Sequence, residues 1–306
     1  MAGRKTKNAT EAYPFVKWAG GKTQLLEAIL ARMPEKIAGT YHEPFLGGGA
    51  VFFKLKALKR VKKAFLSDAN VDLMKAYEAL RDMPEVLLAE LEALAARNNS
   101  KDYYEIRAQD PDGMTNAQKA ARLIYLNKTG FNGLYRVNSK GGFNVPFGDN
   151  PAAKIADREN LLRVHKALAN TKLEASPFKA VLKRAKRGDF VYFDPPYQPV
   201  SKTSSFTAYA KGGFGEVEQR HLAQVVEELS RKGVDVLLSN SDTPLACELY
   251  EGKGYEVERV DARRAINSKA SGRGAIKELL VRVQPKAAGK ARVRVSASQL
   301  SIAFKS

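Results

Sequence analysis

An aspartate, two prolines and a tyrosine follow directly on strand-forming apolar residues in FVYFDPPYQP, residues 190–199. Pro195 keeps Asp194 out of the helical region, and Pro196 keeps Pro195 extended, so the turn is stiff. Neither proline donates an N–H. The Asp194 carboxylate and the Pro195 carbonyl therefore predict a fixed pair of acceptors, which suits an NH₂ group with two hydrogens to donate. Tyr197 offers a flat face on which a base can stack.

A glycine turn in EPFLGGG, residues 43–49, is a second candidate for ligand binding. Its three glycines allow a tight turn and a close approach of the backbone to a ligand. Asp68 lies about 20 residues further on, after the next predicted strand, where an acid could accept hydrogen bonds from ribose hydroxyls. The pattern is typical of a nucleoside cofactor site, although its spacing departs from GxGxxG. Without the acid, a purely structural turn would be the better interpretation.

The stretch FVKWAGGKTQLL, residues 15–26, resembles the end of a Walker A motif. That motif requires a glycine where this chain has Val16, and no strand is predicted before it. An exposed turn that starts a helix is therefore the alternative. Trp18, the sole tryptophan, and Lys22 nevertheless offer an aromatic face for an adenine ring and a cation for a carboxylate.

The apolar pattern predicts an α/β fold. Strands are expected at 41–45, 62–68, 172–176, 189–194, 234–240, 255–260 and 276–283. Helices are expected at 51–60, 71–83, 84–98, 115–130, 157–170 and 216–233. Strands that alternate with helices indicate a mostly parallel sheet covered on both faces, here interrupted by a helical insertion. Residues 131–148, rich in Gly and Asn, predict a hairpin or an ordered loop within that insertion.

The composition limits the possible classes of function further. The 306 residues carry a formal net charge of +18, which favours a polyanionic partner such as nucleic acid over a generic basic surface. No apolar run is long enough to span a membrane, and the N-terminus does not read as a secretory signal. One cysteine, Cys247, and three scattered histidines give no ligand spacing for a metal. A cytoplasmic protein without a metal is the resulting expectation.

A set of motifs resembles one known family. FVKWAGGK, EPFLGGG, SDAN, YLNKTGFNGLYR, GGFNVPFG, DPPY and LSNSD occur here in the order typical of Dam-like, α-group DNA adenine-N6 methyltransferases, which depend on S-adenosylmethionine. The resemblance covers roughly residues 13–285. It implies a Rossmann-like methyltransferase sheet with an inserted helical target-recognition domain. The expected division is a discontinuous catalytic core (13–70 and 170–285), a DNA target-recognition insertion (71–169), and flexible basic arms (1–12 and 286–306).

The resemblance also implies roles for individual residues. The expected contacts to S-adenosyl-L-methionine come from Trp18, Lys22, Asp68 and Asp194, with Phe45 lining the site. The expected contacts to double-stranded DNA come from Lys17 and from the 131–148 stretch, through Asn132, Tyr135, Arg136 and Lys140. Several relatives have an arginine where this chain has Lys140. A lysine lacks the bidentate fork that reads guanine, so the target sequence, GATC in many relatives, stays open.

The implied reaction is methyl transfer to N6 of an adenine flipped out of the duplex. Asp194 and Pro195 would hold the amine and Tyr197 would stack on the base, without a metal or a covalent enzyme intermediate. An RNA adenine, a cytosine N4 and a protein amide are alternative acceptors. A DNA-binding module without catalysis and a nucleotide triphosphatase are the alternative classes. DNA binding would place the protein at the nucleoid. The sequence does not identify protein partners or an accompanying restriction enzyme.

Overall fold

The computed structural model describes residues 11–196, 214–263 and 275–285. Its strands are β1 (Thr40–Glu43), β2 (Lys63–Asp68), β3 (Thr171–Ala175), β4 (Phe190–Phe193), β5 (Asp235–Ser241), β6 (Glu256–Arg263) and β7 (Ala275–Val283). Its α-helices are α1 (Leu26–Ala31), α2 (Ala50–Ala57), α3 (Val71–Asp82), α4 (Pro84–Ala95), α5 (Ser100–Ala108), α6 (Asn116–Thr129), α7 (Arg158–Leu168), α8 (Glu216–Arg231) and α9 (Pro244–Tyr250). Tyr197 and the predicted arm 286–306 lie outside the described residues, as does the arm 1–12 before Glu11.

A seven-stranded sheet forms the centre of the molecule, in the order β3-β2-β1-β4-β5-β7-β6. The strands from β3 to β5 pair in parallel, and β7 lies antiparallel between β5 and β6. This arrangement confirms the predicted Rossmann-like sheet. Because parallel strands end at a common edge, the residues that follow β1, β2, β4 and β5 meet there. We call this the carboxyl edge.

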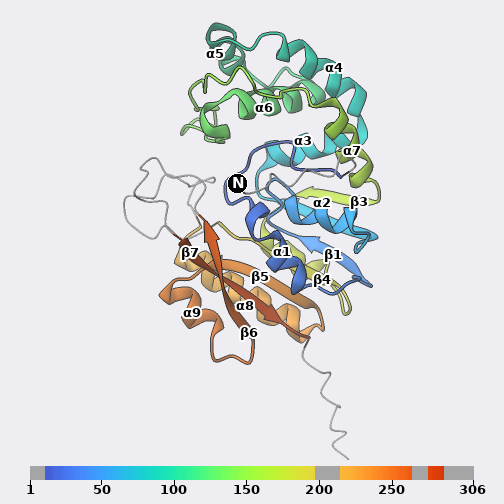
Figure 1. Cartoon of the computed structure of the whole chain (residues 1–306), viewed down its shortest axis with the longest axis vertical. Coiled ribbons are helices and arrows are strands. Elements are labelled where there is room, and N and C mark those ends of the chain that lie inside the picture. The colour runs from blue at the N-terminus through green and yellow to red at the C-terminus, as the bar shows by residue number, and fades with distance from the viewer. Residues whose placement is uncertain (1–10, 197–213, 264–274, 286–306) are drawn as a thin grey trace, which may run out of the picture.

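Two apolar clusters cover the two faces of the sheet. Alternate strand residues point to opposite faces, so Tyr192 of β4 joins one cluster while Val191 and Phe193 join the other. The first cluster includes residues of α1, α2, α3 and α7, and the second includes residues of α8 and α9. Figure 1 shows α1 in front of the sheet and α8 behind it. The fold is therefore a three-layer α/β sandwich.

A helical part is inserted between β2 and β3, as the sequence predicted. Helices α4, α5 and α6 lie at one end of the molecule, beyond α3 and α7 (Figure 1). Leu66 of β2 and Ile124 of α6 belong to the same apolar cluster, so the insertion shares a core with the sheet. The insertion is consequently held rigidly relative to the carboxyl edge.

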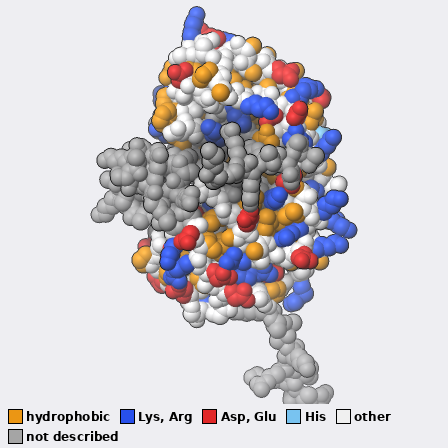
Figure 2. Space-filling model, in the orientation of Figure 1, with side chains coloured by type: hydrophobic (Ala, Val, Ile, Leu, Met, Phe, Trp, Pro, Cys, Tyr) orange, Lys and Arg blue, Asp and Glu red, His pale blue; other side chains and the backbone are white. Residues whose placement is uncertain are grey.

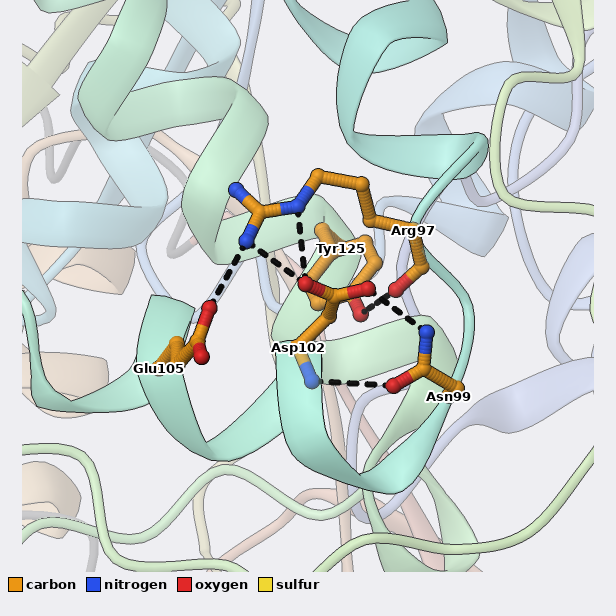
Figure 3. Close-up of polar contacts among 5 residues, drawn as sticks. All are labelled: Arg97, Asn99, Asp102, Glu105 and Tyr125. Atoms are coloured by element: carbon orange, nitrogen blue, oxygen red, sulfur yellow. Dashed lines mark hydrogen bonds and ion pairs between the residues drawn. The ribbon is translucent and has the colours of Figure 1, made fainter.

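Helix α5 was not predicted, because its charged residues obscure the short apolar repeat of Tyr103 and Ile106, which are both fully buried. The preceding turn is held by polar contacts (Figure 3). The buried Tyr125 hydroxyl donates to the Arg97 carbonyl at 2.8 Å. The Arg97 side chain pairs with Asp102 and Glu105 on α5. Exposed ion pairs contribute little, so the turn is fixed mainly by the Tyr125 hydrogen bond and by the Asn99 side chain, which caps α5 by accepting from the Asp102 N–H at 3.0 Å.

The 131–148 stretch forms a short hairpin, one of the two forms expected for it. Antiparallel bridges join Gly130 to Phe147 and Val137 to Phe143. The Gly148 N–H donates to the Thr129 carbonyl at 2.8 Å, which anchors the base of the hairpin to the end of α6. The hairpin thus projects from a rigid helix end.

Candidate active site

Asp194, directly after β4, lies at the centre of the carboxyl edge. Its Oδ1 is 2.8 Å from the Nζ of Lys22, a residue that is only 5% exposed. The lysine also donates to the Gly20 carbonyl at 2.9 Å, and Glu278 of β7 lies 4.0 Å from its Nζ. Two residues predicted to share a ligand site, separated by most of the chain, are thereby brought into direct contact.

A hydroxyl on the neighbouring strand supports the same carboxylate oxygen. Ser239 of β5, fully buried, donates from Oγ to Asp194 Oδ1 at 3.1 Å. Its oxygen lies 2.9 Å from the Tyr192 hydroxyl. A serine has one hydrogen, so when it donates to Asp194 it accepts from Tyr192. The hydrogen-bonded hydroxyls of Ser239 and Tyr192 end at Tyr192, which is fully buried. They therefore orient the Asp194 carboxylate and do not lead a proton to solvent.

The two oxygens of Asp194 differ in their contacts. Among the described residues, none donates a hydrogen bond to Oδ2. Burial raises the pKa of Asp194 above its ordinary value, and Lys22 and then Ser239 oppose that shift. The adjoining Pro195 is buried, whereas Pro196 is exposed. Within the described part of the chain, the arrangement is one oxygen held by Lys22 and Ser239 and a second oxygen without a donor, at the end of a core strand.

Asp68, at the end of β2, joins the glycine turn to the start of α3. Its Oδ2 accepts from the Gly47 N–H at 3.0 Å, and its Oδ1 accepts from the Asn70 N–H at 2.9 Å. Burial raises the pKa of Asp68, while these backbone N–H groups lower it. A carboxylate oxygen has two lone pairs, so each can still accept from a ribose hydroxyl. The predicted cofactor contact is compatible with the geometry and stays a prediction.

Glu43, the last residue of β1, is a buried carboxyl group that the sequence analysis did not single out. Only 3% of it is exposed, and its Oε2 accepts from the Tyr41 hydroxyl at 2.7 Å. Burial raises the pKa of Glu43 to about 8, against the Tyr41 hydrogen bond, and the charge of Asp194 adds to the increase. Glu43 is therefore mostly protonated at neutral pH.

Trp18 connects the glycine turn to the hairpin. Gly47 has a φ of +49°, and a Cβ there would lie 2.9 Å from Trp18 Cδ1, so the indole packs directly on the turn. The ring centroids of Trp18 and Tyr135 are 5.2 Å apart. The Tyr135 hydroxyl donates to Asp72 Oδ2 at 2.9 Å. The predicted cofactor site and the predicted DNA-contacting stretch thus meet at this aromatic pair.

Phe45 belongs to an aromatic cluster beside Asp194. Its ring stacks on Phe178 at 5.4 Å and packs edge-on against Phe193 and Phe214. Phe193 is the residue before Asp194, so the cluster is continuous with the DPPY turn. Phe45 is half-buried, and its predicted role in lining a cofactor site stays a prediction.

A fully buried amide fixes Lys17 to the base of the hairpin. Asn127 of α6 accepts from the Lys17 N–H at 2.8 Å and donates to the Lys17 and Gly133 carbonyls at 2.8 and 2.9 Å. Gly133 has a φ of +66°, and a Cβ there would lie 2.3 Å from Lys17 Cδ. Only a glycine at position 133 leaves room for the Lys17 side chain to pass over the backbone. Lys17 is exposed, so its charge remains available to a ligand.

The remaining predicted DNA contacts differ in exposure. Asn132, with a φ of +55°, Arg136 and Lys140 are exposed on the hairpin. The Arg136 guanidinium donates to the Asn144 carbonyl across the hairpin, and Asn138 Oδ1 accepts from the Lys140 N–H at 3.0 Å at the tip. Tyr135 is only 8% exposed, so in this structure it supports the hairpin from within. Contacts of all four residues with DNA stay predictions.

The charges at the carboxyl edge favour a cationic ligand. Lys22 is adjoined by Asp194 and Glu278, and Asp68 lies at the end of β2, whereas the mostly protonated Glu43 adds little negative charge. Among the residues that the structure describes, no group of His, Cys, Asp and Glu could hold a metal ion. None of the described helices is long and apolar enough to cross a bilayer.

Sequence reasoning missed Ser239, Tyr192 and Glu43. Ser239 lies in the LSNSD motif, and its signal would have been the position of that motif at the end of a strand expected beside the DPPY strand. Tyr192 and Glu43 were read only as strand residues. Cys247 is half-buried in α9, with its Sγ 3.5 Å from Asp242 Oδ1. The exposed Arg259 also contacts this sulfur, through Nη2 at 3.3 Å.

Comparison with known proteins identifies relatives over most of the chain. Residues 18–266 match the model of the D12 class N6 adenine-specific DNA methyltransferases. A type II methyltransferase of Lactococcus lactis subsp. cremoris, M1.LlaDCHI, is 44% identical over 90% of this chain and 96% of its own length. M.MjaIII of Methanocaldococcus jannaschii is 41% identical over 89% and 99%. A DNA adenine methylase of Vibrio cholerae is 37% identical over 89% and 96%.

The first prediction concerns the pH dependence of stability. Glu43 has a pKa of about 8 when folded against 4.5 as its ordinary value, so between these values the folded chain keeps a proton that the unfolded chain releases. The free energy of unfolding should therefore fall with rising pH, by about 1.4 kcal/mol per pH unit from this group alone. Glu43→Gln should remove that decline. Denaturant unfolding at several pH values checks this, and parallel profiles for both proteins would refute it.

The second prediction concerns Ser239. Ser239→Ala should lower kcat by roughly 10- to 100-fold, because a hydrogen bond to a carboxylate contributes about 1.5–3 kcal/mol and the anchor of Asp194 is lost. Cofactor and DNA affinities should change little. Ser230→Ala is the matched control, since this buried serine donates to the Gln284 carbonyl at 3.0 Å, away from Asp194. Equal kcat values for the two variants would exclude a positioning role.

Proposed function

The chain belongs to the D12 class of N6 adenine-specific DNA methyltransferases, and we propose that it methylates a flipped-out adenine of duplex DNA with S-adenosyl-L-methionine as the methyl donor. The observation that carries this proposal is Asp194. One of its oxygens is anchored by Lys22 and Ser239, and the other is available as an acceptor. Such a carboxylate at the end of a core strand suits an exocyclic amine better than a phosphate or a carboxylate.

The carboxyl edge fits S-adenosylmethionine. This cofactor supplies a methyl group activated by a positively charged sulfonium. The carboxylates of Asp68, Asp194 and Glu278 outnumber the single lysine beside them, which favours a cation. Trp18 and Phe45 would supply apolar contact, Asp68 would accept from ribose hydroxyls, and Lys22 would share its charge between Asp194 and the carboxylate of the cofactor.

Asp194 and Pro195 would activate the adenine. The N6 lone pair is delocalised into the ring, which makes N6 a poor nucleophile. Hydrogen bonds from both N6 hydrogens, to Asp194 Oδ2 and to the Pro195 carbonyl, would draw the nitrogen toward tetrahedral geometry and localise that lone pair. After N6 gains the methyl group it must lose a proton, and the Asp194 carboxylate, whose pKa is raised by burial, can accept it.

Positioning and charge would supply most of the rate enhancement. A fixed acceptor that aligns N6 with the methyl group converts an encounter into an intramolecular reaction, a contribution of several kcal/mol. The Asp194 charge lies where positive charge develops on N6, which adds electrostatic stabilisation. Flipping the adenine costs a few kcal/mol, which stacking on an aromatic side chain would offset. Tyr197, assigned to that stacking, lies outside the described residues.

The hairpin is our candidate for sequence reading. We assign residues 71–169 to DNA target recognition, and 13–70 with 170–285 to catalysis. Lys17 and the exposed hairpin residues Asn132, Arg136 and Lys140 would contact the duplex, with Tyr135 holding the hairpin against Trp18. GATC, suggested by the family resemblance, is the working proposal for the target. DNA binding would place the protein in the cytoplasm at the nucleoid.

The direct test of this function replaces Asp194. Asp194→Ala should lower transfer of labelled methyl groups to DNA by at least about 10³-fold, while the fold and most of the DNA affinity persist. Asp194→Asn, which keeps the shape but not the charge, should also fail. Asp82→Ala, at an exposed acid of α3, is the control. Labelled DNA formed at the normal rate by Asp194→Ala would show that another group activates the acceptor.

A further prediction concerns Lys140. Lys140→Ala should relax sequence preference at one base pair, because a good base contact contributes about 1–3 kcal/mol of discrimination. Nonspecific affinity should fall no more than in Lys101→Ala, at an exposed lysine of α5. Sequencing of modified bases in DNA from cells that express each variant measures the motif. An unchanged motif in Lys140→Ala would remove this residue from base reading.

A further inference from the structure

Two basic stretches of the sequence come together on the side of the sheet opposite the active site. The first stretch, KLKALKRVKK (54–63), ends at the first residue of β2. The second stretch, LKRAKRG (182–188), lies just before β4. Only β1 separates these two strands, and all three run parallel. Their amino ends therefore meet at one edge of the sheet, which we call the amino edge, although more than 100 residues separate the stretches in sequence.

Backbone contacts make the amino edge one continuous surface. The Ile37 N–H donates to the Arg60 carbonyl at 2.9 Å, which joins the segment before β1 to the segment before β2. A Cβ on Gly39 would lie 2.5 Å from the Gly188 carbonyl oxygen, which joins the segments before β1 and β4. The Gly188 N–H donates to the Gly233 carbonyl at 3.1 Å, which extends the surface to β5.

The cations of this surface are exposed and lack acidic partners. We define the basic edge by the residues Lys36, Lys59, Lys62, Lys63, Lys172, Lys186 and Arg187, all of them exposed. Within the described residues, no ion pair joins any of them to an acid. Figure 2 shows Lys and Arg side chains grouped on this flank, at the right of the view, where α2 ends.

Most of the acids near the basic edge are already engaged in hydrogen bonds or ion pairs with other residues. Asp189 is only 2% exposed and accepts from the Thr40 and Lys186 N–H groups, with His42 Nε2 at 3.1 Å. Asp235 pairs with Arg282. Glu35, beside Lys36, is exposed, but it is one acid against the seven cations of the basic edge. The surface therefore carries a concentrated positive potential that a polyanion would neutralise.

A duplex in the active site does not account for this surface. Strand β2 begins at Lys63, on the basic edge, and ends at Asp68, on the carboxyl edge. Five residue steps of a strand span roughly 17 Å, and the sheet itself lies between the two edges. The cations of the basic edge therefore face away from DNA held at Asp194.

We propose that the basic edge binds a second segment of duplex DNA, independently of sequence, while the first segment occupies the active site. The amino ends from β3 to β5 extend over roughly 20 Å at the spacing of paired strands. A duplex presents about a dozen phosphates over that length. Lysine and arginine side chains suit phosphates without reading bases, so this surface would add affinity and no specificity.

Such a surface lets the enzyme pass between DNA segments directly. A second segment would bind before the first is released, so that the chain transfers without a free intermediate. This proposal rests on the proposed binding of duplex DNA at Asp194, but it does not depend on the target sequence or on the role of Lys140. It predicts that free duplex accelerates the departure of the enzyme from a duplex already bound.

The test uses two charge-matched pairs of substitutions in the full chain. One variant combines Lys62→Gln with Lys63→Gln, and the other combines Lys186→Gln with Arg187→Gln, so that each samples one basic stretch. The control combines Arg220→Gln with Arg231→Gln, two exposed arginines of α8 that pair with acids. Dissociation from a labelled short duplex is followed while the concentration of an unlabelled duplex without the target is raised.

In the parent chain and the control, dissociation should speed up as the unlabelled duplex increases. In each test pair this acceleration should weaken, and the salt slope of second-duplex binding, log K against log salt, should fall by about 1.8 because two phosphate contacts are lost. Methylation of the short duplex should be unchanged. Acceleration equal to that of the control in both test pairs would overturn the proposal. So would unchanged transfer accompanied by weaker binding to anionic lipid vesicles, which would assign the surface to a membrane.

Discussion

The site depends on one constraint, the immobilisation of a single carboxylate oxygen. Asp194 Oδ1 is held by the Lys22 ammonium and by the Ser239 hydroxyl, one from the N-terminal segment and one from the adjacent strand β5. A carboxylate held at one oxygen presents the other in a fixed direction, and the prolines that follow keep the backbone from relaxing. In the proposed mechanism, rotation of this group would separate the acceptor from the substrate amine, so the loss of the Ser239 contact would reduce catalysis before it reduced binding.

The parallel sheet distributes opposite charges to its two edges. Asp68 ends β2 and Asp194 follows β4 at the carboxyl edge, where their carboxylates would flank a cofactor site suited to a cation, whereas Glu43 at the end of β1 is mostly protonated. Lysines and arginines precede the same strands at the amino edge. The acidic site would exclude stray phosphates from the reaction centre, while the basic surfaces of the chain attract DNA.

Much of this was readable from the sequence, because strands ending in EPFLGGG, SDAN and DPPY implied a parallel sheet with a site at its carboxyl edge. The family motifs then indicated the residues that the structure places together, such as Lys22 with Asp194. The hydroxyl chain through Ser239 and Tyr192 was not readable, because it depends on which strands are neighbours and on side-chain direction. Helix α5 was missed because its stability comes from the buried Tyr103 and Ile106 and not from a long apolar repeat. The basic edge could likewise not be predicted from the sequence, because it depends on the strand order.

The central claim is tested most directly by a crystal structure of the chain with a target duplex and an unreactive analogue of the cofactor. The account predicts an extrahelical adenine whose N6 lies about 3 Å from Asp194 Oδ2, with Oδ1 still in contact with Lys22 and Ser239. A flipped adenine whose N6 contacts neither oxygen of Asp194, or an Asp194 side chain that turns away from the bound analogue into the interior, would contradict it.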